Sequence, residues 1–306
     1  MELESLLRII RWQNLLLIAL TQYLIRYALF LPFHIAVSLD DFHFFLLVLA
    51  TALLAGAGNI IYHFYNQGVI SINDPQNPVV NKIITEKRAL YWFFGLNVMG
   101  VGIGFYLANS VGFPAFSGFF ILSSALLYLH ASYLKKIPLI GNLTSCILVG
   151  LVFLIVAVFD LLPAITPRNI ATQQVLFSIV MDYAIFAMMI SLIREIVKDQ
   201  MALKGDYNSG NQSLPVLLGT QRTNWLVFIA ALLPLSALIY YLYNYLLENL
   251  VAALYVLFLL VAPLLFFLSR IVKAKSPKDF KQLSTLLKGI LIAEILSMGI
   301  YQYILI

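Results

Sequence analysis

Long apolar stretches, separated by charged segments, constrain this chain more than any other feature of its sequence. A membrane-spanning helix needs about 20 apolar residues, and nine stretches qualify: 14–33, 43–62, 90–109, 114–133, 139–161, 175–192, 224–243, 250–268 and 285–305. Hydrophobic residues make up 62% of the chain and charged residues 11%, which is too apolar for a water-soluble core. We therefore expect an all-α integral membrane protein with nine transmembrane helices around a central, lipid-accessible cavity.

The basic residues predict the orientation of these helices. Lys and Arg are retained on the cytoplasmic side of a membrane. If the N-terminus is cytoplasmic, seventeen of the 19 Lys and Arg residues fall on cytoplasmic segments, with Arg168 outside and Arg26 within the first span. We therefore expect a cytoplasmic N-terminus and an outside C-terminus. The net charge of +5 then reflects topology, and no basic surface interleaved with aromatic residues suggests a nucleic-acid partner.

Two polar connections, 62–89 and 194–223, are much longer than the others. They lie roughly 130 residues apart, which suggests an internal duplication. We expect a single transmembrane domain, 1–306, made of two similar helical halves at about 1–135 and 136–306. Long connections in a compact bundle usually carry function.

The second connection carries the most informative motif. It reads Arg194-Glu195-Ile196-Val197-Lys198-Asp199 and continues through Gly205-Asp206 to Leu214-Pro215. It resembles the second polar loop of the UbiA superfamily of intramembrane prenyltransferases, which runs R-E-x-x-K-D-x-E-D-x-x-G-D and then T-L-P. Met201 and Ala202 stand at the other two acidic positions. The R-E-x-x-K-D phrase is most similar to the branch that alkylates glyceryl phosphates.

Two further segments resemble the same family in the expected order. The first polar connection contains Ile72-Asn73-Asp74-Pro75-Gln76-Asn77-Pro78, similar to the tail of the first family motif, and the linker-like run 84–89. The acidic head of that motif is replaced by Tyr62, His63, Asn66 and Ile70. The segment 133–142 resembles the short loop before the fifth helix, and it includes Lys135 and Asn142.

The resemblance implies a UbiA-like fold and the transfer of a polyprenyl group from its diphosphate to a small or lipid acceptor. In such a reaction Mg²⁺ and cationic side chains neutralise the diphosphate leaving group. The implied catalytic and metal-binding residues are Asp199 and Asp206, with Mg²⁺ as cofactor if the protein is active. The implied substrate-binding residues are Tyr62, His63, Asn66, Asn73, Lys135, Asn142, Arg194 and Lys198. A bacterial or archaeal inner membrane is the expected location.

The seven-residue spacing of Asp199 and Asp206 places them two turns apart on one face if the helix continues. We nevertheless expect Asp199 in an exposed loop, where its substitution leaves folding intact. The charged run also has a simpler interpretation as a solvated helix end, with Glu195 paired to Lys198 or Asp199.

Two other functions stay open. The protein is alternatively a catalytically inactive UbiA-like protein that binds an isoprenoid lipid or a partner membrane protein. Tyr62, His63 and Asn66 only weakly replace an acidic magnesium cage, and Ile70 cannot replace it. A secondary transporter is a weaker hypothesis, because no span has paired Gly and Pro interruptions.

Ionisable residues in or near the spans need partners or water, because each costs at least about 2.5 kcal/mol to insert into a membrane. Four such residues are present: Arg26, Asp160, Asp182 and Glu294. Arg26 and Asp182 both fall in the middle of their spans. We therefore predict an ion pair between these two side chains and an interfacial position for Asp160.

Overall fold

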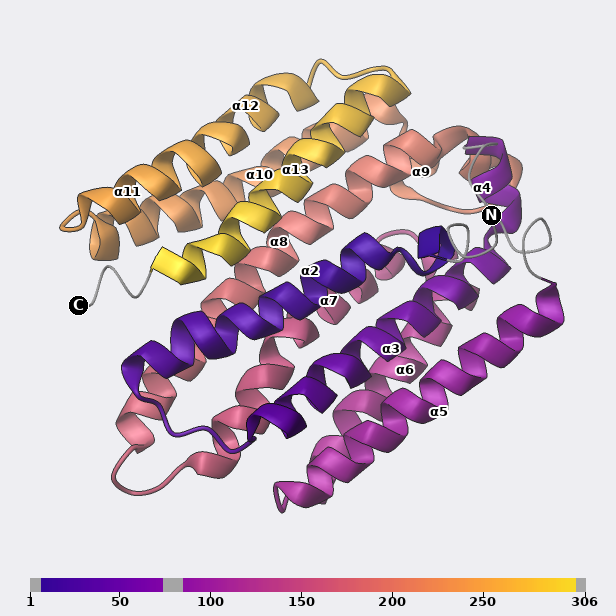
Figure 1. Ribbon diagram of the computed structural model, residues 1–306. Helices are drawn as coiled ribbons and strands as arrows, with labels where there is room; N and C mark the ends of the chain where they lie inside the picture. Colours follow the sequence, from indigo (N-terminus) through magenta and orange to yellow (C-terminus); the bar gives the residue numbers. More distant parts are fainter. Residues whose placement is uncertain (1–6, 74–84, 301–306) are drawn as a thin grey trace. The chain divides into compact units, whose positions relative to one another are not determined.

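Helices make up almost all of the computed structural model, which describes residues 7–73 and 85–300 (Figure 1). Nine helical segments in this part of the chain are long and apolar enough to cross a membrane: Trp12–Phe33, Asp41–Tyr65, Glu86–Ser110, Pro114–Ser132, Ile140–Ala164, Ile170–Asn208, Thr220–Leu246, Leu250–Ile271 and Pro277–Ile300. The predicted all-α fold with nine spans is confirmed. The end of the last predicted span, beyond residue 300, lies outside the described residues.

The chain divides into two compact units. Unit 1 comprises Met1–Lys135 and Leu151–Asp182, and unit 2 comprises Lys136–Gly150 and Tyr183–Ile306. Helices α7 (Ile140–Asp160) and α8 (Ile170–Asn208) each contribute segments to both units. The duplication of two similar helical halves stays a prediction.

Unit 1 is held together by close helix packing. Its main helices pack side by side (Figure 1): α2 (Trp12–Leu24), α3 (Asp41–Tyr65), α5 (Glu86–Ser110) and α6 (Ser117–Ser132). Glycines permit this approach, because a side chain at Gly58 would collide with Leu127 and one at Gly104 with Phe120. Small residues at helix contacts are typical of membrane proteins, where packing replaces the hydrophobic effect.

Side-chain caps fix where two of these helices begin. Asp40 accepts a hydrogen bond from the backbone N–H of His43 at 2.7 Å at the start of α3, and Thr85 accepts one from the N–H of Arg88 at the start of α5. Such bonds satisfy backbone donors that have no partner inside the helix. The bond from the His43 N–H holds the pKa of Asp40 below its usual value.

Arg26 forms a buried ion pair with Asp160, not with Asp182. Its Nη1 lies 3.1 Å from Asp160 Oδ1, and its Nη2 donates to the backbone oxygen of Leu39 at 2.8 Å and contacts Asp41 Oδ1 at 3.3 Å. Asp160 is completely buried, whereas Asp182 is exposed. The predicted Arg26–Asp182 pair is therefore wrong, because the acid that meets Arg26 comes from α7 and not from α8.

The interfacial position of Asp160 stays a prediction, but its side chain is covered by the protein. The connection 34–40 binds the end of α7, where the N–H of Leu39 donates to Asp160 Oδ1 at 3.2 Å and the N–H of Ser38 donates to the Asp160 backbone oxygen at 3.0 Å. The hydropathy pattern does not predict that the 34–40 connection binds the end of α7. This connection removes from water a residue that the end of a span would otherwise expose.

Unit 2 packs its helices around a separate apolar core. The helices are α10 (Thr220–Tyr241), α11 (Leu250–Val256), α12 (Ala262–Ile271) and α13 (Pro277–Ser297), joined by the part of α8 that lies in this unit. Phe267 and Phe280 are fully or almost fully buried in this core. Helix α13 starts at a capping box, in which Ser276 and Asp279 exchange side-chain and backbone hydrogen bonds, so its start is strongly specified.

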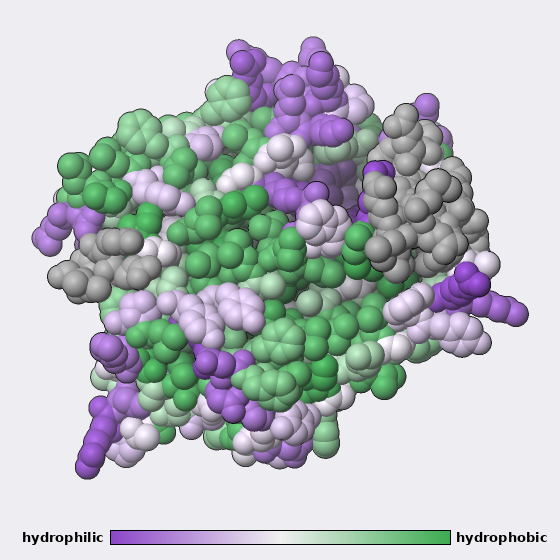
Figure 2. Space-filling view, in the orientation of Figure 1, coloured by the Kyte–Doolittle hydropathy of each residue, from purple (hydrophilic) through white to green (hydrophobic). Residues whose placement is uncertain are grey.

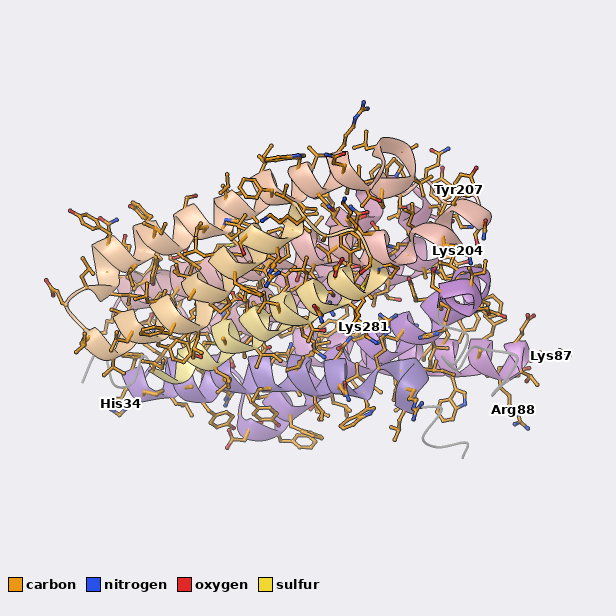
Figure 3. All side chains as sticks on the ribbon, turned by 90° about the horizontal axis from the view of Figure 1, so that it is seen from above. His34, Lys87, Arg88, Lys204, Tyr207 and Lys281 are labelled. Carbon is orange, nitrogen blue, oxygen red and sulfur yellow. The ribbon has the colours of Figure 1, made fainter. Side chains whose placement is uncertain are left out.

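The surface agrees with a membrane environment. Hydrophobic residues cover broad areas along the helices, and hydrophilic residues gather mostly near helix ends (Figure 2). On α5, Tyr91 and Val98 are 75% and 71% exposed. In unit 1, Lys87 and Arg88 lie at the opposite end from His34 (Figure 3). The chain is an integral, multi-pass membrane protein.

Candidate functional site

The charged run is helical, so the prediction of a loop from Arg194 onward is wrong. Residues 194–208 belong to α8, which ends before Gly210 in a left-handed conformation with φ of 72°. The run has neither Gly nor Pro before Gly205, and its charges alternate at helical spacing, which favours continuation. Asp199 and Asp206 therefore lie about two turns apart on one face of one helix, as their spacing predicts for a continuous helix.

Asp199 is buried, contrary to the expectation of an exposed carboxylate. Its side chain is among the least exposed polar groups, at 1%. Asn142 Nδ2 donates to Asp199 Oδ2 at 2.7 Å. Asn142 lies in the first turn of α7, just after Leu139 in a left-handed conformation. The structure thus brings together two residues that the family resemblance assigned to the site.

Asp206 is held by the chain reversal that follows α8. It is 2% exposed, its Oδ1 accepts from Asn211 Nδ2 at 3.2 Å, and its backbone oxygen accepts from the Asn211 N–H at 2.9 Å. Lys204 and Tyr207, which flank it in sequence, lie at the same end of the helix (Figure 3). A carboxylate fixed by its own turn has a defined position before any ligand binds.

The two cations of the run already make contacts within unit 2. Lys198 Nζ lies 2.7 and 2.9 Å from the two carboxylate oxygens of Glu195, which is the ion pair of the simpler interpretation. Arg194 Nε donates to the backbone oxygen of Ser284 at 3.3 Å and so links α8 to α13. Contacts of Arg194 and Lys198 with phosphate stay predictions.

The predicted residues of the first motif cluster at the end of α3 in unit 1. His63 is 2% exposed, and its ring meets the ring of Tyr62 edge-on at 6.1 Å. Asn66 Nδ2 donates to the backbone oxygens of Tyr62 at 3.0 Å and Ala131 at 3.1 Å. These bonds occupy both amide hydrogens of Asn66 and attach the end of α3 to α6.

Two residues join this cluster without having been predicted as site residues. The guanidinium carbon of Arg11 lies 5.1 Å from the centre of the Tyr62 ring, and His130 stacks on the same ring at 6.2 Å. No local pattern signals their contacts, because the contacts join different helices.

Asn73 and Lys135 are the remaining predicted residues of unit 1. Asn73 ends the short helix α4 (Gln67–Asn73) with an exposed side chain, and Lys135 is half-buried in the turn Leu134–Lys136. Asp74, the one acid of the degenerate first motif, lies outside the described residues.

The two sets of residues differ in their fit to Mg²⁺. This ion prefers hard oxygen ligands and is usually bound through one or two carboxylates together with water and phosphate oxygens. In unit 2, Asp199 and Asp206 supply carboxylates and Asn142 supports one of them, so these residues fit the ion. In unit 1, the phenol of Tyr62 and the imidazole of His63 do not form such a ligand set. In the ranges 7–73 and 85–300, no three His, Cys, Asp or Glu side chains form a metal-binding group by themselves.

Known proteins are similar to this chain in sequence. Digeranylgeranylglyceryl phosphate synthase of Methanosphaera stadtmanae is 29% identical over 80% of this chain and 83% of the relative. The protein of that name from Methanosarcina mazei is 32% identical over 61% of this chain and 59% of the relative.

Solved structures share the fold. A structure of digeranylgeranylglyceryl phosphate synthase superposes with a TM-score of 0.66 at 20% identity, covering 97% of this chain and 99% of the other. A UbiA homologue from Archaeoglobus fulgidus, bound to DMAPP and Mg²⁺, gives 0.57 at 16% identity with the same coverage.

The family of this chain follows from a match to a sequence model of a protein family. The model of the UbiA prenyltransferase family matches residues 15–289, which is most of the chain and includes all three motif-bearing segments. The resemblance seen in the motifs is thereby confirmed. This chain belongs to the UbiA prenyltransferase family.

Proposed function

We propose that this protein transfers a prenyl group from a prenyl diphosphate to the hydroxyl group of a glyceryl phosphate lipid. The observation that carries this proposal is the pair of buried acids, Asp199 and Asp206, on one face of α8. The names of the relatives support the acceptor class, since both similar enzymes named above are digeranylgeranylglyceryl phosphate synthases.

The reaction breaks the bond between the allylic carbon of the prenyl chain and the diphosphate oxygen. The electron pair of that bond leaves with diphosphate, and the acceptor oxygen forms a new ether bond to the allylic carbon. The hydroxyl proton is released. Bound Mg²⁺ would neutralise charge that develops on the diphosphate.

The residues of unit 2 divide this work. Asp199 and Asp206 would hold Mg²⁺, and Asn142 orients the carboxylate of Asp199 through its 2.7 Å hydrogen bond. Partners of this kind fix the direction of a metal-binding side chain. Arg194 offers a forked guanidinium and Lys198 a point charge toward phosphate oxygens.

The orientation in the membrane belongs to this proposal. A cytoplasmic N-terminus places the charged end of α8 on the cytoplasmic side of the membrane. There the diphosphate group of the substrate can lie in water while its prenyl chain lies in the membrane. A reporter inserted near Lys275 should be cytoplasmic, and one fused after Ile306 should be outside. Finding both reporters on the same side would contradict the orientation.

The test of activity uses the full chain in detergent with geranylgeranyl diphosphate, Mg²⁺ and a glyceryl phosphate lipid. Mass spectrometry should detect the ether product and released diphosphate in the wild type, and about 100-fold less of each, or still less, in Asp199→Asn. A quinone-precursor ring acid serves as the alternative acceptor. Product on the ring acid alone would contradict the proposed acceptor but not prenyl transfer.

The composition of unit 1 favours a second candidate function. Tyr62 and His63 replace acidic positions of the family motif, which is compatible with a protein that binds an isoprenoid diphosphate without turning it over. Saturable binding of geranylgeranyl diphosphate with no product from any acceptor would favour this second candidate over the first.

A further inference from the structure

Glu294 is a carboxyl group buried inside the last span of unit 2. It lies in α13, one turn before the helix ends at Ser297, and it is 2% exposed. Neither of its carboxyl oxygens has a hydrogen-bond partner in residues 7–73 and 85–300, and no Lys or Arg of these ranges acts on it electrostatically. The carboxyl faces the backbone of α8 at Ala187, where the N–H group belongs to the helix interior. Buried polar atoms are nearly always hydrogen-bonded, so two oxygens without a partner call for an explanation.

The hydroxyl groups around Glu294 present oxygen lone pairs rather than hydrogens. Ser297 Oγ donates to the backbone oxygen of Glu294 at 2.6 Å. A serine has a single hydroxyl hydrogen, so Tyr183 is the donor in the 2.7 Å bond between Tyr183 Oη and Ser297 Oγ. Tyr255 Oη donates to the backbone oxygen of Ala293 at 2.7 Å. The hydrogens of the three hydroxyl groups are therefore used in these bonds, while their oxygens can still accept.

The end of α13 adds to this excess of negative charge. The last carbonyl groups of a helix carry a partial negative charge and favour a cation, and Glu294 lies in this last turn. An ionised carboxylate alone in an apolar core is costly, so the site needs a proton or a cation. A proton on the carboxyl would itself need an acceptor within hydrogen-bond distance, and the described residues supply none. A metal cation instead satisfies several oxygens at once.

We propose that Glu294, Ser297 and Tyr183 bind a monovalent metal cation inside unit 2, and we call these three residues the Glu294 site. Alkali cations take oxygen ligands, and in membrane proteins the C-terminal ends of helices contribute to binding them. A single positive charge matches the single carboxylate, whereas a divalent ion would leave a net positive charge in an apolar core. The bound ion would connect α8 to α13.

The Glu294 site is distinct from the acids proposed to bind Mg²⁺. Tyr183 precedes Asp199 by 16 positions on the same helix, which corresponds to about 24 Å along its axis. The proposal therefore does not depend on the proposed function, and its test needs no prenyl substrate.

The test is equilibrium dialysis of the full chain in neutral detergent against radioactive Na⁺ and, separately, radioactive Rb⁺ as a substitute for K⁺. Choline chloride keeps the ionic strength constant. The wild type should retain one ion per chain. Glu294→Gln keeps the size of the side chain but removes its charge, and it should weaken binding at least tenfold. Glu248→Gln is the matched control, because Glu248 is an exposed glutamate of unit 2, and it should leave the affinity unchanged.

A second variant and a second measurement guard against misfolding of Glu294→Gln. Ser297→Ala keeps the carboxylate but removes one oxygen, and it should weaken binding less than Glu294→Gln. Dicyclohexylcarbodiimide reacts with protonated carboxyl groups in apolar surroundings, so the bound cation should slow modification of Glu294 in the wild type at least tenfold. Mass spectrometry measures the modification, and thermal unfolding checks that each variant is folded.

Three results would overturn the proposal. Retention of neither Na⁺ nor Rb⁺ by the wild type would show that no cation binds. Equal retention by the wild type and Glu294→Gln would assign the ion to another site. Modification of Glu294 at the same rate with and without the cations would show a protonated carboxyl satisfied by water. None of these results bears on prenyl transfer at Asp199 and Asp206.

Discussion

Unit 1 and unit 2 each bury a carboxylate, but they place it in different surroundings. In unit 1, Asp160 meets the guanidinium of Arg26 at 3.1 Å and the N–H of Leu39 at 3.2 Å, while the end of α3 carries phenol, imidazole and amide groups. In unit 2, Asp199 meets the neutral amide of Asn142 at 2.7 Å, and Asp206 lies two turns away. The ion pair of Asp160 in unit 1 stabilises the fold. In unit 2, Asp199 and Asp206 are the residues that the family resemblance assigns to metal binding.

The largest expected effect is on the stability of unit 1. Asp160→Asn should lower the free energy of unfolding by about 3–5 kcal/mol, because it leaves the buried charge of Arg26 without its main counter-ion. Thermal unfolding in detergent measures this loss. Asp182→Asn is the matched control, because Asp182 is exposed, and it should change stability by less than about 0.5 kcal/mol.

The double variant Arg26→Met with Asp160→Leu sharpens this result. Removing both charges should cost less than Asp160→Asn alone, since no uncompensated ion remains. Equal losses in all variants would show that the ion pair itself contributes little and that packing of the 34–40 connection dominates.

In unit 2 the acid should matter more for chemistry than for stability. Asp199→Asn should reduce Mg²⁺-dependent release of diphosphate by about 100-fold or more, equal to about 2.7 kcal/mol in the activation barrier. The loss of stability should be smaller than for Asp160→Asn, because the amide keeps the size of the side chain. Full activity of the variant would exclude Asp199 as a metal ligand.

The next effect concerns the partner of Asp199. Asn142→Ala should weaken Mg²⁺ affinity by about 10–100-fold, the usual loss when a supporting hydrogen bond to a metal ligand is removed. Thr144→Ala is the control, because Thr144 lies on the same helix and its hydroxyl donates to the backbone oxygen of Ile140, one turn earlier. Activity measured across Mg²⁺ concentrations separates a loss of metal affinity from a loss of maximal rate. An unchanged Mg²⁺ dependence would assign Asn142 to packing.

The smallest effect is expected at Lys198. Its ion pair with Glu195 is partly exposed, so Lys198→Gln should lower stability by only about 0.3–0.5 kcal/mol. If Lys198 also contacts phosphate, the Kd for geranyl diphosphate should rise about tenfold, equal to about 1.4 kcal/mol. Lys204→Gln, an exposed change on the same helix, provides the baseline. Equal affinities of the two variants would favour the simple solvated pair.

The sequence predicted the spans, the family and the shared face of Asp199 and Asp206, because all three depend on local periodicity or local motifs. It failed where distant segments meet. Arg26 and Asp182 both lie in the middle of their spans, which suggested that they pair. Contacts between helices depend also on how each helix is rotated about its axis. Arg26 lies in a π-helical turn, Ile25–Phe30, which changes the direction of its side chain. The burial of Asp199 likewise depends on Asn142, which comes from another helix.

The account rests on one central claim, that the carboxylates of unit 2 bind the metal and the groups at the end of α3 do not. Mn²⁺ in place of Mg²⁺ allows bound ions to be counted by electron paramagnetic resonance in the presence of geranyl diphosphate. The claim predicts one strongly bound Mn²⁺ per chain, lost in Asp199→Asn and retained in His63→Ala. Two bound ions, or one that survives Asp199→Asn and is lost in His63→Ala, would contradict it.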